Sequence, residues 1–564
     1  MTKKLDDYTK EELIQTIKSL KKRKKFGLVW EDKPEKVVDQ CQEMLPVLEE
    51  VPERVIKKDA DDLTNLIIEG DNYHSLSVLN YTHAGKIDLI YIDPPYNTGN
   101  KDFIYNDQYV DKEDVFRHSK WLNFISKRLA SAKNLLKDSG IIFISIDDVE
   151  QANLKLLCDQ IFGAENFIAN ITVYSNPRGR QSSTNIAETH EYVLIYRKSS
   201  MANITGDRLT DSQKKEYSKQ DGNSRYRELG LRKRGSDSRR EDSPNLYFPI
   251  YYVENTGVIR LDASKDAIEL LPRLSDGSDG RWRWSREKVI RDSDQLIVRS
   301  VNAKNGSLYD IFQKDYLTDD KRRKVKSLWG EKEINYDRAA EEIRAIFGDK
   351  VFDYAKPLYL LKKIISMSSP NDGLILDFMA GSGTTGHAVM QLNKEDEGRR
   401  KFILCTNNEN GIAENITYQR IKRVTEGYGS ADGIPANLRY FKTDFVNKEK
   451  TDDQTRLSLV DRCTDMIRIR EDAYDSLIDE KDFKLFSSID HNTAILFDPH
   501  NIEKCVRKIE MIDIEKPLNI YIFSYSNYAY EEDVPETKLH YTIRPIPESI
   551  LEVYKRIFKE KSDV

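Results

Sequence analysis

The sequence predicts an α/β fold built on a mostly parallel sheet, and three observations support this. Short, apolar and largely β-branched runs recur at 66–68, 87–92 and 140–146. Helix-prone segments, such as the one over 121–136, separate these runs. Each run is followed directly by an acidic residue, which marks the end of the strand. Runs of this kind are typical of strands that are buried between two layers of helices.

Composition is that of a globular protein with several structural units. The chain has 564 residues, of which 39% are hydrophobic and 33% charged, so we expect three or four units around one main domain. No apolar run reaches the roughly 18 residues that a membrane span needs, and the lysine-rich start does not resemble a signal peptide. We therefore expect a cytoplasmic protein with no membrane partner.

Five scattered cysteines form no CxxC pair and have no histidine cluster beside them. This spacing predicts neither a disulfide framework nor a metal site, and we expect reduced cysteines that pack in the core. The net charge of -6 does not by itself indicate a nucleic-acid-binding protein, so a basic surface for nucleic acid has to be local.

Changes in composition divide the chain into five segments. An amphipathic helix is predicted over 10–20, and the α/β pattern begins near 64 and includes a strand at 190–196. A polar and basic stretch interrupts the pattern, which resumes with a helix at 339–347 and a strand at 374–377. The predicted segments are an N-terminal helical segment 1–50, a first core segment 51–199, an inserted domain 200–335, a second core segment 336–434 and a C-terminal domain 435–564 with strands at 493–497 and 519–524.

The first candidate site is Asp93-Pro94-Pro95-Tyr96, which follows the strand 87–92 directly. Ligands of open α/β sheets bind beyond the carboxyl ends of the strands, and consecutive prolines keep the backbone extended and rigid. The Asp93 carboxylate and the Pro94 carbonyl can accept both hydrogens of an exocyclic base amine, while the Tyr96 ring stacks on a flipped base. This chemistry needs neither a metal nor a covalent intermediate.

A turn in which Asp93 only caps the next segment is the alternative interpretation, because acidic residues and prolines commonly gather at turns. The longer run DPPYNTG after an apolar strand, together with a second motif far downstream, argues against a simple turn.

The second candidate site is the glycine-rich run DFMAGSGTTG, which begins at Asp377 and leads from a strand into a helix. Glycines let the backbone approach a ligand closely, and a helix N-terminus favours a negative group such as a carboxylate. The glycine spacing is not that of a dinucleotide site, and no Walker lysine is present.

Together, the two motifs resemble those of the amino-methyltransferases of DNA. Because the catalytic motif precedes the cofactor motif, the chain resembles the permuted β class, and within it the modification (Mod) subunits of Type III restriction-modification systems. Further segments carry the resemblance over about 25–430: 25–35, 68–72, 280–284, 327–329, 356–357 and 414–421. The resemblance implies a circularly permuted, Rossmann-like sheet that uses S-adenosylmethionine to methylate N6 of adenine at specific DNA sites.

The resemblance also implies roles for individual residues. Asp93 would accept the amine, Pro94 and Pro95 would shape the catalytic loop, and Tyr96 would stack on the base. The cofactor site would comprise Asp71, Lys356, Pro357, Asp377, Phe378, Ala380, Gly381, Ser382, Gly383, Thr384 and Thr385. The carboxylate that usually binds the ribose is not in its usual place, and both Asn407 and Glu409 stay candidates for that role.

The insertion at 200–335 is where this family keeps its target-recognition domain. Its basic clusters suit contacts with DNA phosphates and guanines, although charge runs are often only solvated loops. The aromatic and β-branched stretch from 247 to 284 is typical of folded structure. We expect DNA contacts at Arg232, Lys233, Arg234, Arg239 and Arg240.

Two other functions stay open at this point. Methylation of N4 of cytosine uses the same geometry, but aspartate at the first motif position favours adenine. A protein of a different class, a specificity subunit that mainly delivers a restriction nuclease, would also need the DNA-binding segment. The resemblance implies double-stranded DNA, a homodimer and a restriction (Res) helicase-nuclease subunit as partners.

Overall fold

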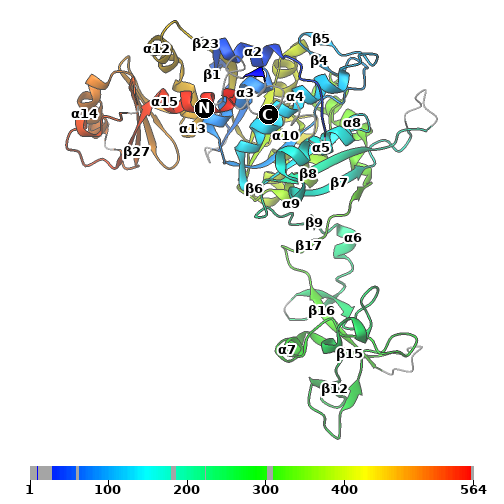
Figure 1. Cartoon of the computed structure of the whole chain (residues 1–564). Helices are drawn as coiled ribbons and strands as arrows, with labels where there is room; N and C mark the ends of the chain where they lie inside the picture. Colours follow the sequence, from blue (N-terminus) through cyan, green and yellow to red (C-terminus); the bar gives the residue numbers. More distant parts are fainter. Residues whose placement is uncertain are drawn as a thin grey trace. The chain divides into compact units, whose positions relative to one another are not determined.

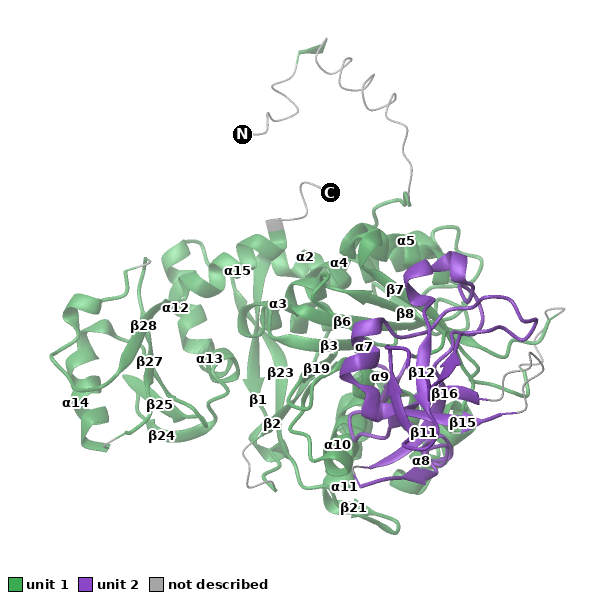
Figure 2. Cartoon of the chain, turned by 90° about the horizontal axis from the view of Figure 1, so that it is seen from below, with its two compact units in different colours: residues 1–205, 325–564 green, residues 206–324 purple. Residues whose placement is uncertain are grey.

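The computed structural model describes residues 9–10, 28–58, 63–179, 186–222, 224–301, 309–512, 514–526 and 528–559. The helix predicted over 10–20 lies outside these residues, apart from Lys10. Two compact units are present, one formed by 1–205 with 325–564 and the other by Gly206–Lys324 (Figure 2). Among the described residues, no helix is long and apolar enough to cross a membrane.

A ten-stranded sheet forms the centre of the first unit (Figure 1). The five neighbouring pairs from β23 to β6 are parallel, whereas β1, β8 and β7 join antiparallel neighbours. The predicted α/β fold is therefore confirmed. In spatial order the strands are β1 (Met44–Glu50), β23 (Asn437–Asn447), β2 (Thr64–Glu69), β20 (Lys401–Thr406), β19 (Leu374–Asp377), β3 (Ile87–Ile92), β6 (Leu136–Ile146), β8 (Glu191–Arg197), β7 (Phe167–Val173) and β18 (Leu328–Trp329).

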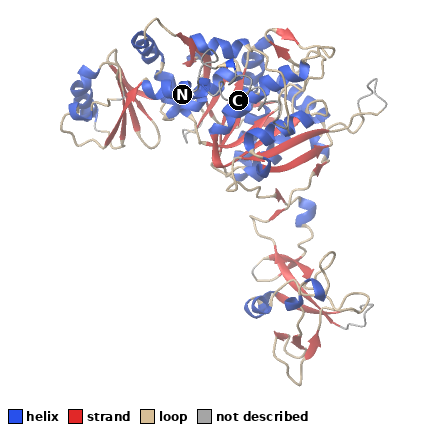
Figure 3. Ribbon diagram, in the orientation of Figure 1, coloured by secondary structure: helices blue, strands red, loops and turns tan. Residues whose placement is uncertain are grey.

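Helices cover both faces of this sheet, which explains why the central strands read as continuous apolar runs (Figure 3). Neighbouring residues of one strand face opposite layers: Ile67 and Leu89 pack in one core, whereas Ile68 and Ile90 pack in the other. One layer contains α3 (Asn72–Thr82), α4 (Arg117–Leu135) and α5 (Gln151–Phe162), and the other contains α9 (Leu358–Ser368), α10 (Thr384–Asp396) and α11 (Tyr418–Glu426).

Two strands from distant stretches of the sequence meet at the centre of the sheet. Strand β19 pairs in parallel with β3, while β20 lies beyond β19 and β6 lies beyond β3. The chain leaves the two strands in opposite directions, and the carboxyl ends of strands at such a point are the usual ligand position in open α/β sheets. The residues that follow β3 and β19 therefore share one edge.

The C-terminal residues add a second sheet to the first unit. Strands β26 (Asn492–Leu496), β27 (Leu518–Phe523) and β28 (Tyr541–Ile546) run parallel, and β24 (Asp475–Asp479) and β25 (Phe483–Ser487) complete it. Helix α14 (Ile502–Ile512) covers one face, and the other face packs on the main core. Further α-helices among the described residues of the unit are α2 (Lys36–Glu43), α8 (Tyr336–Phe347), α12 (Asp452–Arg462), α13 (Thr464–Arg470) and α15 (Glu548–Lys559), and β4 (Ile104–Tyr105) pairs with β5 (Gln108–Tyr109).

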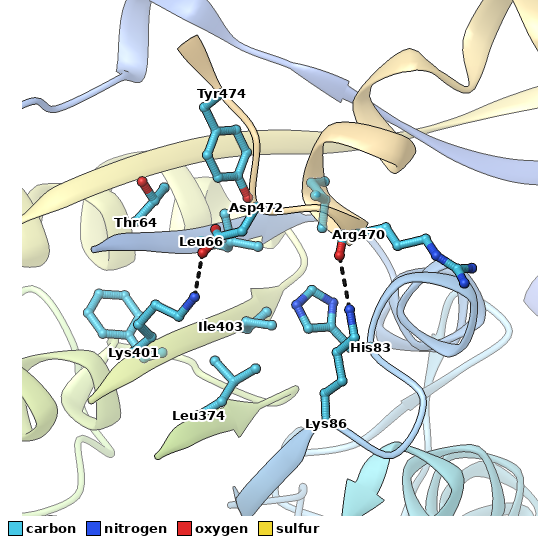
Figure 4. Close-up of a pocket in the computed structure, with 12 residues that line it drawn as sticks. Thr64, Leu66, His83, Lys86, Leu374, Lys401, Ile403, Arg470, Asp472 and Tyr474 are labelled. Atoms are coloured by element: carbon cyan, nitrogen blue, oxygen red, sulfur yellow. Dashed lines mark hydrogen bonds and ion pairs between the residues drawn. The ribbon is translucent and has the colours of Figure 1, made fainter. Parts of the chain in front are cut away.

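A cavity of about 100 Å³ lies where α13 meets the amino ends of the central strands (Figure 4). Its walls include Thr64 and Lys401, which begin β2 and β20. The Lys401 ammonium contacts the Asp472 carboxylate at 2.7 Å, and Lys86 donates to the Arg470 carbonyl at 2.9 Å. The cavity is therefore at the end of the sheet opposite to the predicted catalytic motif.

The second unit is a small folded domain, as the aromatic content of its sequence indicates. Its core contains Phe248, Trp282 and Trp284. One sheet has the order β10-β11-β16-β15 and another the order β13-β12-β14. The elements are β9 (Asp207–Arg208), α6 (Asp211–Lys214), β10 (Lys219–Gln220), β11 (Arg225–Gly230), β12 (Ile250–Val253), β13 (Val258–Arg260), β14 (Ile268–Leu270), α7 (Arg286–Arg291), β15 (Leu296–Ser300), β16 (Tyr309–Tyr316) and β17 (Arg322–Arg323).

Candidate active site

The two predicted motifs lie at the same edge of the main sheet. Asp93 follows the last residue of β3, and Asp377 is the last residue of the neighbouring parallel strand β19. Asp71 follows β2, and Asn407 follows β20. Four strand ends therefore bring predicted site residues to the carboxyl edge, as expected for an open α/β sheet.

Asp93 lies against a buried lysine. Its side chain keeps 24% exposure, and its Oδ1 atom is 2.8 Å from the Nζ atom of Lys356. Burial raises the pKa of Asp93, the Lys356 ammonium partly offsets this increase, and the nearby Glu191 carboxylate adds to it. An ionised Asp93 in this place is a strong hydrogen-bond acceptor whose charge depends on its neighbours.

Lys356 is the centre of the polar cluster. It is 7% exposed, and its Nζ atom donates to the Tyr96 hydroxyl at 2.9 Å and lies 3.5 Å from Glu191 Oε2. Burial alone lowers the pKa of Lys356, but Asp93 and Glu191 together raise it well above its ordinary value. The structure thus places Lys356 against the catalytic motif, although its predicted role was to bind the cofactor.

Hydrogen bonds from Trp121 and to Glu150 hold the loop after Asp93 in place. The Pro95 carbonyl accepts a hydrogen bond from Trp121 Nε1 at 2.7 Å. Asn97 has φ of 60° and donates through Nδ2 to the fully buried Glu150 at 2.6 Å. Because of these contacts and the prolines, the positions of the Pro94 carbonyl and of the Tyr96 ring are fixed before any ligand binds.

The glycine loop is organised by Asp377. Its Oδ1 accepts from the Met379 amide at 3.0 Å, and its Oδ2 accepts from the Thr385 hydroxyl at 2.5 Å. Burial raises the pKa of Asp377 to about 7. Gly381 and Gly383 have φ of 50° and 75°, a region that glycine tolerates best. The loop can therefore bring bare backbone close to a ligand at the start of α10.

A buried arginine supports the same loop from the side of the core. Arg420 is fully buried, and its Nη1 atom donates to the hydroxyls of Ser382 and Thr384 at 3.2 and 2.7 Å. Its Nη2 atom contacts Glu342 at 2.9 Å. The geometry of the loop thus depends on a charged pair that lies behind it.

The other predicted cofactor residues divide into buried and accessible groups. Asp71 accepts from the Tyr73 amide at 2.7 Å, is 3.2 Å from Arg128 and keeps 30% exposure. Asn407 and Glu409 are exposed beyond β20. Pro357 is the buried N-cap residue of α9, and Phe378 and Ala380 are buried in the loop. The accessible residues Asp71, Asn407 and Glu409 are the ones that stay available to polar groups of a ligand.

The predicted DNA contacts lie in the second unit, on the segment that follows β11. Arg234, Arg239 and Arg240 are exposed, and Arg232 and Lys233 are half-buried. Arg240 stacks 4.2 Å from the Tyr247 ring centre and contacts Asp279 at 3.1 Å. Arg240 thus stabilises the fold of the segment, while Arg234 and Arg239 are more accessible.

Sequence reasoning missed three residues of the site: Glu191, Tyr336 and Arg420. Glu191 lay in a predicted strand, and a buried charged residue at the start of an apolar strand was the available signal. Tyr336 had no motif around it, and Arg420 lay in the segment 414–421 of the resemblance without a role assigned to it. Among the residues that the structure describes, no group of three or more His, Cys, Asp or Glu could hold a metal ion.

Comparison with known proteins identifies a family. A family model described as DNA methylase matches residues 87–417, a range that includes both motifs. The Type II methyltransferase M.KpnI of Klebsiella pneumoniae is 42% identical over 361 residues, which cover 64% of this chain and 84% of that protein. The EcoPI Mod subunit of the Type III enzyme of Escherichia phage P1 is 33% identical over 64% of this chain and 61% of its own length.

Solved structures give a more distant likeness. A DNA modification methylase from Thermus thermophilus, complexed with S-adenosyl-L-methionine, has 13% identity and a TM-score of 0.32, and the match covers 67% of this chain and 98% of that one. Relatives include Type II and Type III enzymes, so the narrower expectation of a Type III Mod subunit stays a prediction. The extent of the family match shows that the chain belongs to the DNA methylase family, whose methyl donor, S-adenosylmethionine, is its cofactor.

Proposed function

We propose that this protein methylates the exocyclic N6 of an adenine that is flipped out of double-stranded DNA at a specific site. The observation that carries the proposal is the placement of Asp93 beside the Asp377 loop, on neighbouring parallel strands. A base acceptor and a cofactor loop at one strand edge are what direct methyl transfer requires.

In this proposal the rigid Asp93 loop orients the amine. The Asp93 carboxylate and the Pro94 carbonyl accept the two N–H groups, so that the nitrogen lone pair points away from the loop. The Tyr96 ring stacks on the base, which is worth about 1–3 kcal/mol per base. The proton that the amine loses passes to Asp93 or to water, and the raised pKa of Asp93 favours its role as acceptor.

The residues of the glycine loop fit the cofactor. S-adenosylmethionine supplies an electrophilic methyl carbon, which bonds to nitrogen as the C–S bond breaks with its electrons left on sulfur. A side chain at Gly383 would meet Thr417 Cγ2 at 3.2 Å, so the loop is built for bare backbone. Asp71 would accept from the adenosine moiety, and Asn407 or Glu409 would take the ribose hydroxyls.

The second unit would read the DNA sequence. Its exposed basic segment, with Arg234 and Arg239, offers phosphate and base contacts. Two small antiparallel sheets give this segment a fixed frame. We therefore propose that 206–324 is the target-recognition domain, and that it works as a folded surface.

A place in a restriction-modification system is proposed from the relatives. The Type III Mod subunits belong to such systems by name, and M.KpnI is named as a Type II methyltransferase. A Type III role would add a homodimer and a Res helicase-nuclease partner. The alternative, that the chain mainly delivers a nuclease, is compatible with catalysis by the same polypeptide.

Product analysis tests the proposed function. The purified protein is incubated with unmethylated plasmid and methyl-labelled S-adenosylmethionine, beside the Asp93→Ala variant, and the nucleosides are then separated. We expect N6-methyladenine with the wild type and none with the variant. N4-methylcytosine would favour the cytosine alternative, and the absence of label in DNA despite cofactor binding would favour a delivery subunit.

A further inference from the structure

Glu191 is a buried carboxylate next to the catalytic motif. It begins strand β8 and is 3% exposed. Its Oε2 atom accepts hydrogen bonds from the Tyr96 hydroxyl at 2.8 Å and from the Tyr336 hydroxyl, and it lies 3.5 Å from the Lys356 ammonium. Four distant segments of the chain thus meet at one oxygen atom.

This arrangement leaves the cluster with an excess negative charge. Asp93 and Glu191 are acidic, and Lys356 is the cation that contacts both. Within the residues that the structure describes, Glu191 Oε1 is buried without a hydrogen-bond partner. Other buried side-chain atoms of the described residues share this condition, so it is the contacts of Oε2 that point to a role for Glu191.

We infer that Glu191 is a positioning residue for methyl transfer. It fixes the Tyr96 ring through the Tyr96 hydroxyl, and it holds the Lys356 ammonium in place. The net charge around Asp93 then stabilises the amine nitrogen, which becomes positive as it is methylated. In this proposal Glu191 acts through Tyr96 and Lys356. The inference rests on the proposed function, because it assigns Glu191 a task only if Asp93 accepts the amine.

The charge on Glu191 has a measurable effect on Asp93. The Glu191 carboxylate is one of the groups that raise the pKa of Asp93, after burial. Removing that charge therefore lowers the pKa of Asp93, and the acid limb of the rate profile moves to lower pH. The titratable groups that act on Asp93 or are affected by it are Lys356, Glu191, Tyr96, Tyr91, Tyr336 and Asp377.

A purely structural role would produce a different result. In that case Glu191 would only join β8 to α8, and its loss would reduce stability and the amount of active protein. The plateau kcat per active molecule would not change, because the contacts of Glu191 with Tyr96 and Lys356 would then have no part in catalysis.

Glu191→Gln is the direct test, since it keeps the shape and removes the charge. We expect kcat on the plateau to fall about 10- to 100-fold, with KM for DNA and for S-adenosylmethionine changed less than about threefold. The acid limb, measured from about pH 5.5 to 9, should move to lower pH. An unchanged limb, or wild-type kcat, would overturn the inference.

Glu471→Gln is the matched control. Glu471 also accepts from a buried tyrosine, Tyr521, at 2.5 Å, and from Asn519 at 2.7 Å, but it lies on the C-terminal sheet side of the unit. We expect its substitution to lower stability and to leave kcat and the acid limb unchanged. A shift of the limb in this control as large as that in Glu191→Gln would contradict the assignment.

Tyr336→Phe keeps the inference testable if Glu191→Gln does not fold. It removes one partner of Glu191 and leaves the charge in place, so kcat should fall at least about threefold while the acid limb stays where it is. Wild-type kcat in this variant would overturn the inference. A wild-type enzyme that makes no N6-methyladenine would instead contradict the proposed function.

Discussion

Strand β3 carries one aspartate near each end, and the two differ in how they are satisfied. Asp88 lies near the amino end at 8% exposure, with Lys137 at 2.8 and 2.9 Å from its two oxygens and the Leu374 amide at 2.9 Å. Asp93, just past the carboxyl end, keeps 24% exposure and shares Lys356 with Glu191 and Tyr96.

The difference separates a structural carboxylate from one available to a ligand. Both oxygens of Asp88 are used to bind β3 to its neighbours, so nothing is left for a substrate. Asp93 has one strong partner that is itself shared, and some of its side chain faces outward. The residue type is the same, but Asp93 is more exposed and has fewer committed hydrogen bonds.

Lys356→Met should give a large kinetic effect. Because the ammonium lowers the pKa of Asp93, its removal raises that pKa, and the acid limb of kcat should move to higher pH. At neutral pH we expect a loss of at least about 100-fold. Rates measured across pH check this, with Lys137→Met as the control, which changes the cation beside Asp88 and should leave the profile unchanged.

An acid limb at the wild-type pH in Lys356→Met would contradict the difference between Asp88 and Asp93, because the charge on Asp93 would then not depend on Lys356.

Arg420→Met tests a charge near the site whose task is structural. Removing the guanidinium leaves Glu342 behind the loop without its partner, which should reduce the free energy of unfolding by about 3 kcal/mol. Urea denaturation measures it. Arg338→Met, which removes an exposed pair with Glu341 on the same helix, should change stability little.

Equal destabilisation by the Arg338 and Arg420 variants would contradict a special role for the buried pair.

Asp377→Asn tests a carboxylate that is intermediate between Asp88 and Asp93. Both oxygens of Asp377 accept hydrogen bonds, as in Asp88, but neither of these bonds comes from a cation. The pKa of about 7 in the folded state exceeds the value of about 3.9 in the unfolded chain, so the folded protein binds the extra proton. The contribution of this group to the free energy of unfolding is therefore present at low pH. It is lost as the pH rises towards 7, by at most about 1.4 kcal/mol per pH unit.

The Asn variant cannot titrate at this position. Its free energy of unfolding relative to the wild type should thus increase between about pH 5 and 7, as measured by denaturation at each pH. A difference that stays constant with pH would show that Asp377 is ionised throughout.

The sheet and both motifs could be predicted from the sequence because each is encoded by residues that are neighbours in the chain. An apolar run followed by Asp93, or by Asp377 and its glycines, needs only neighbouring residues to be recognised. The cluster around Lys356 could not be predicted, since Glu191 and Tyr336 come from segments far apart in the chain. A predicted helix start at 352–365 and the resemblance placed Lys356 near the cofactor, and only the packing of α8 and α9 on the sheet shows its contact with Asp93.

The most direct test of the account is a comparison of Asp93→Asn with Asp88→Asn in one assay. Single-turnover methyl transfer to DNA and thermal melting are measured for both variants. We expect Asp93→Asn to lose at least about 100-fold in rate and to melt near the wild type, whereas Asp88→Asn should melt earlier and react at nearly the wild-type rate. A near-wild-type rate in Asp93→Asn would contradict the central claim.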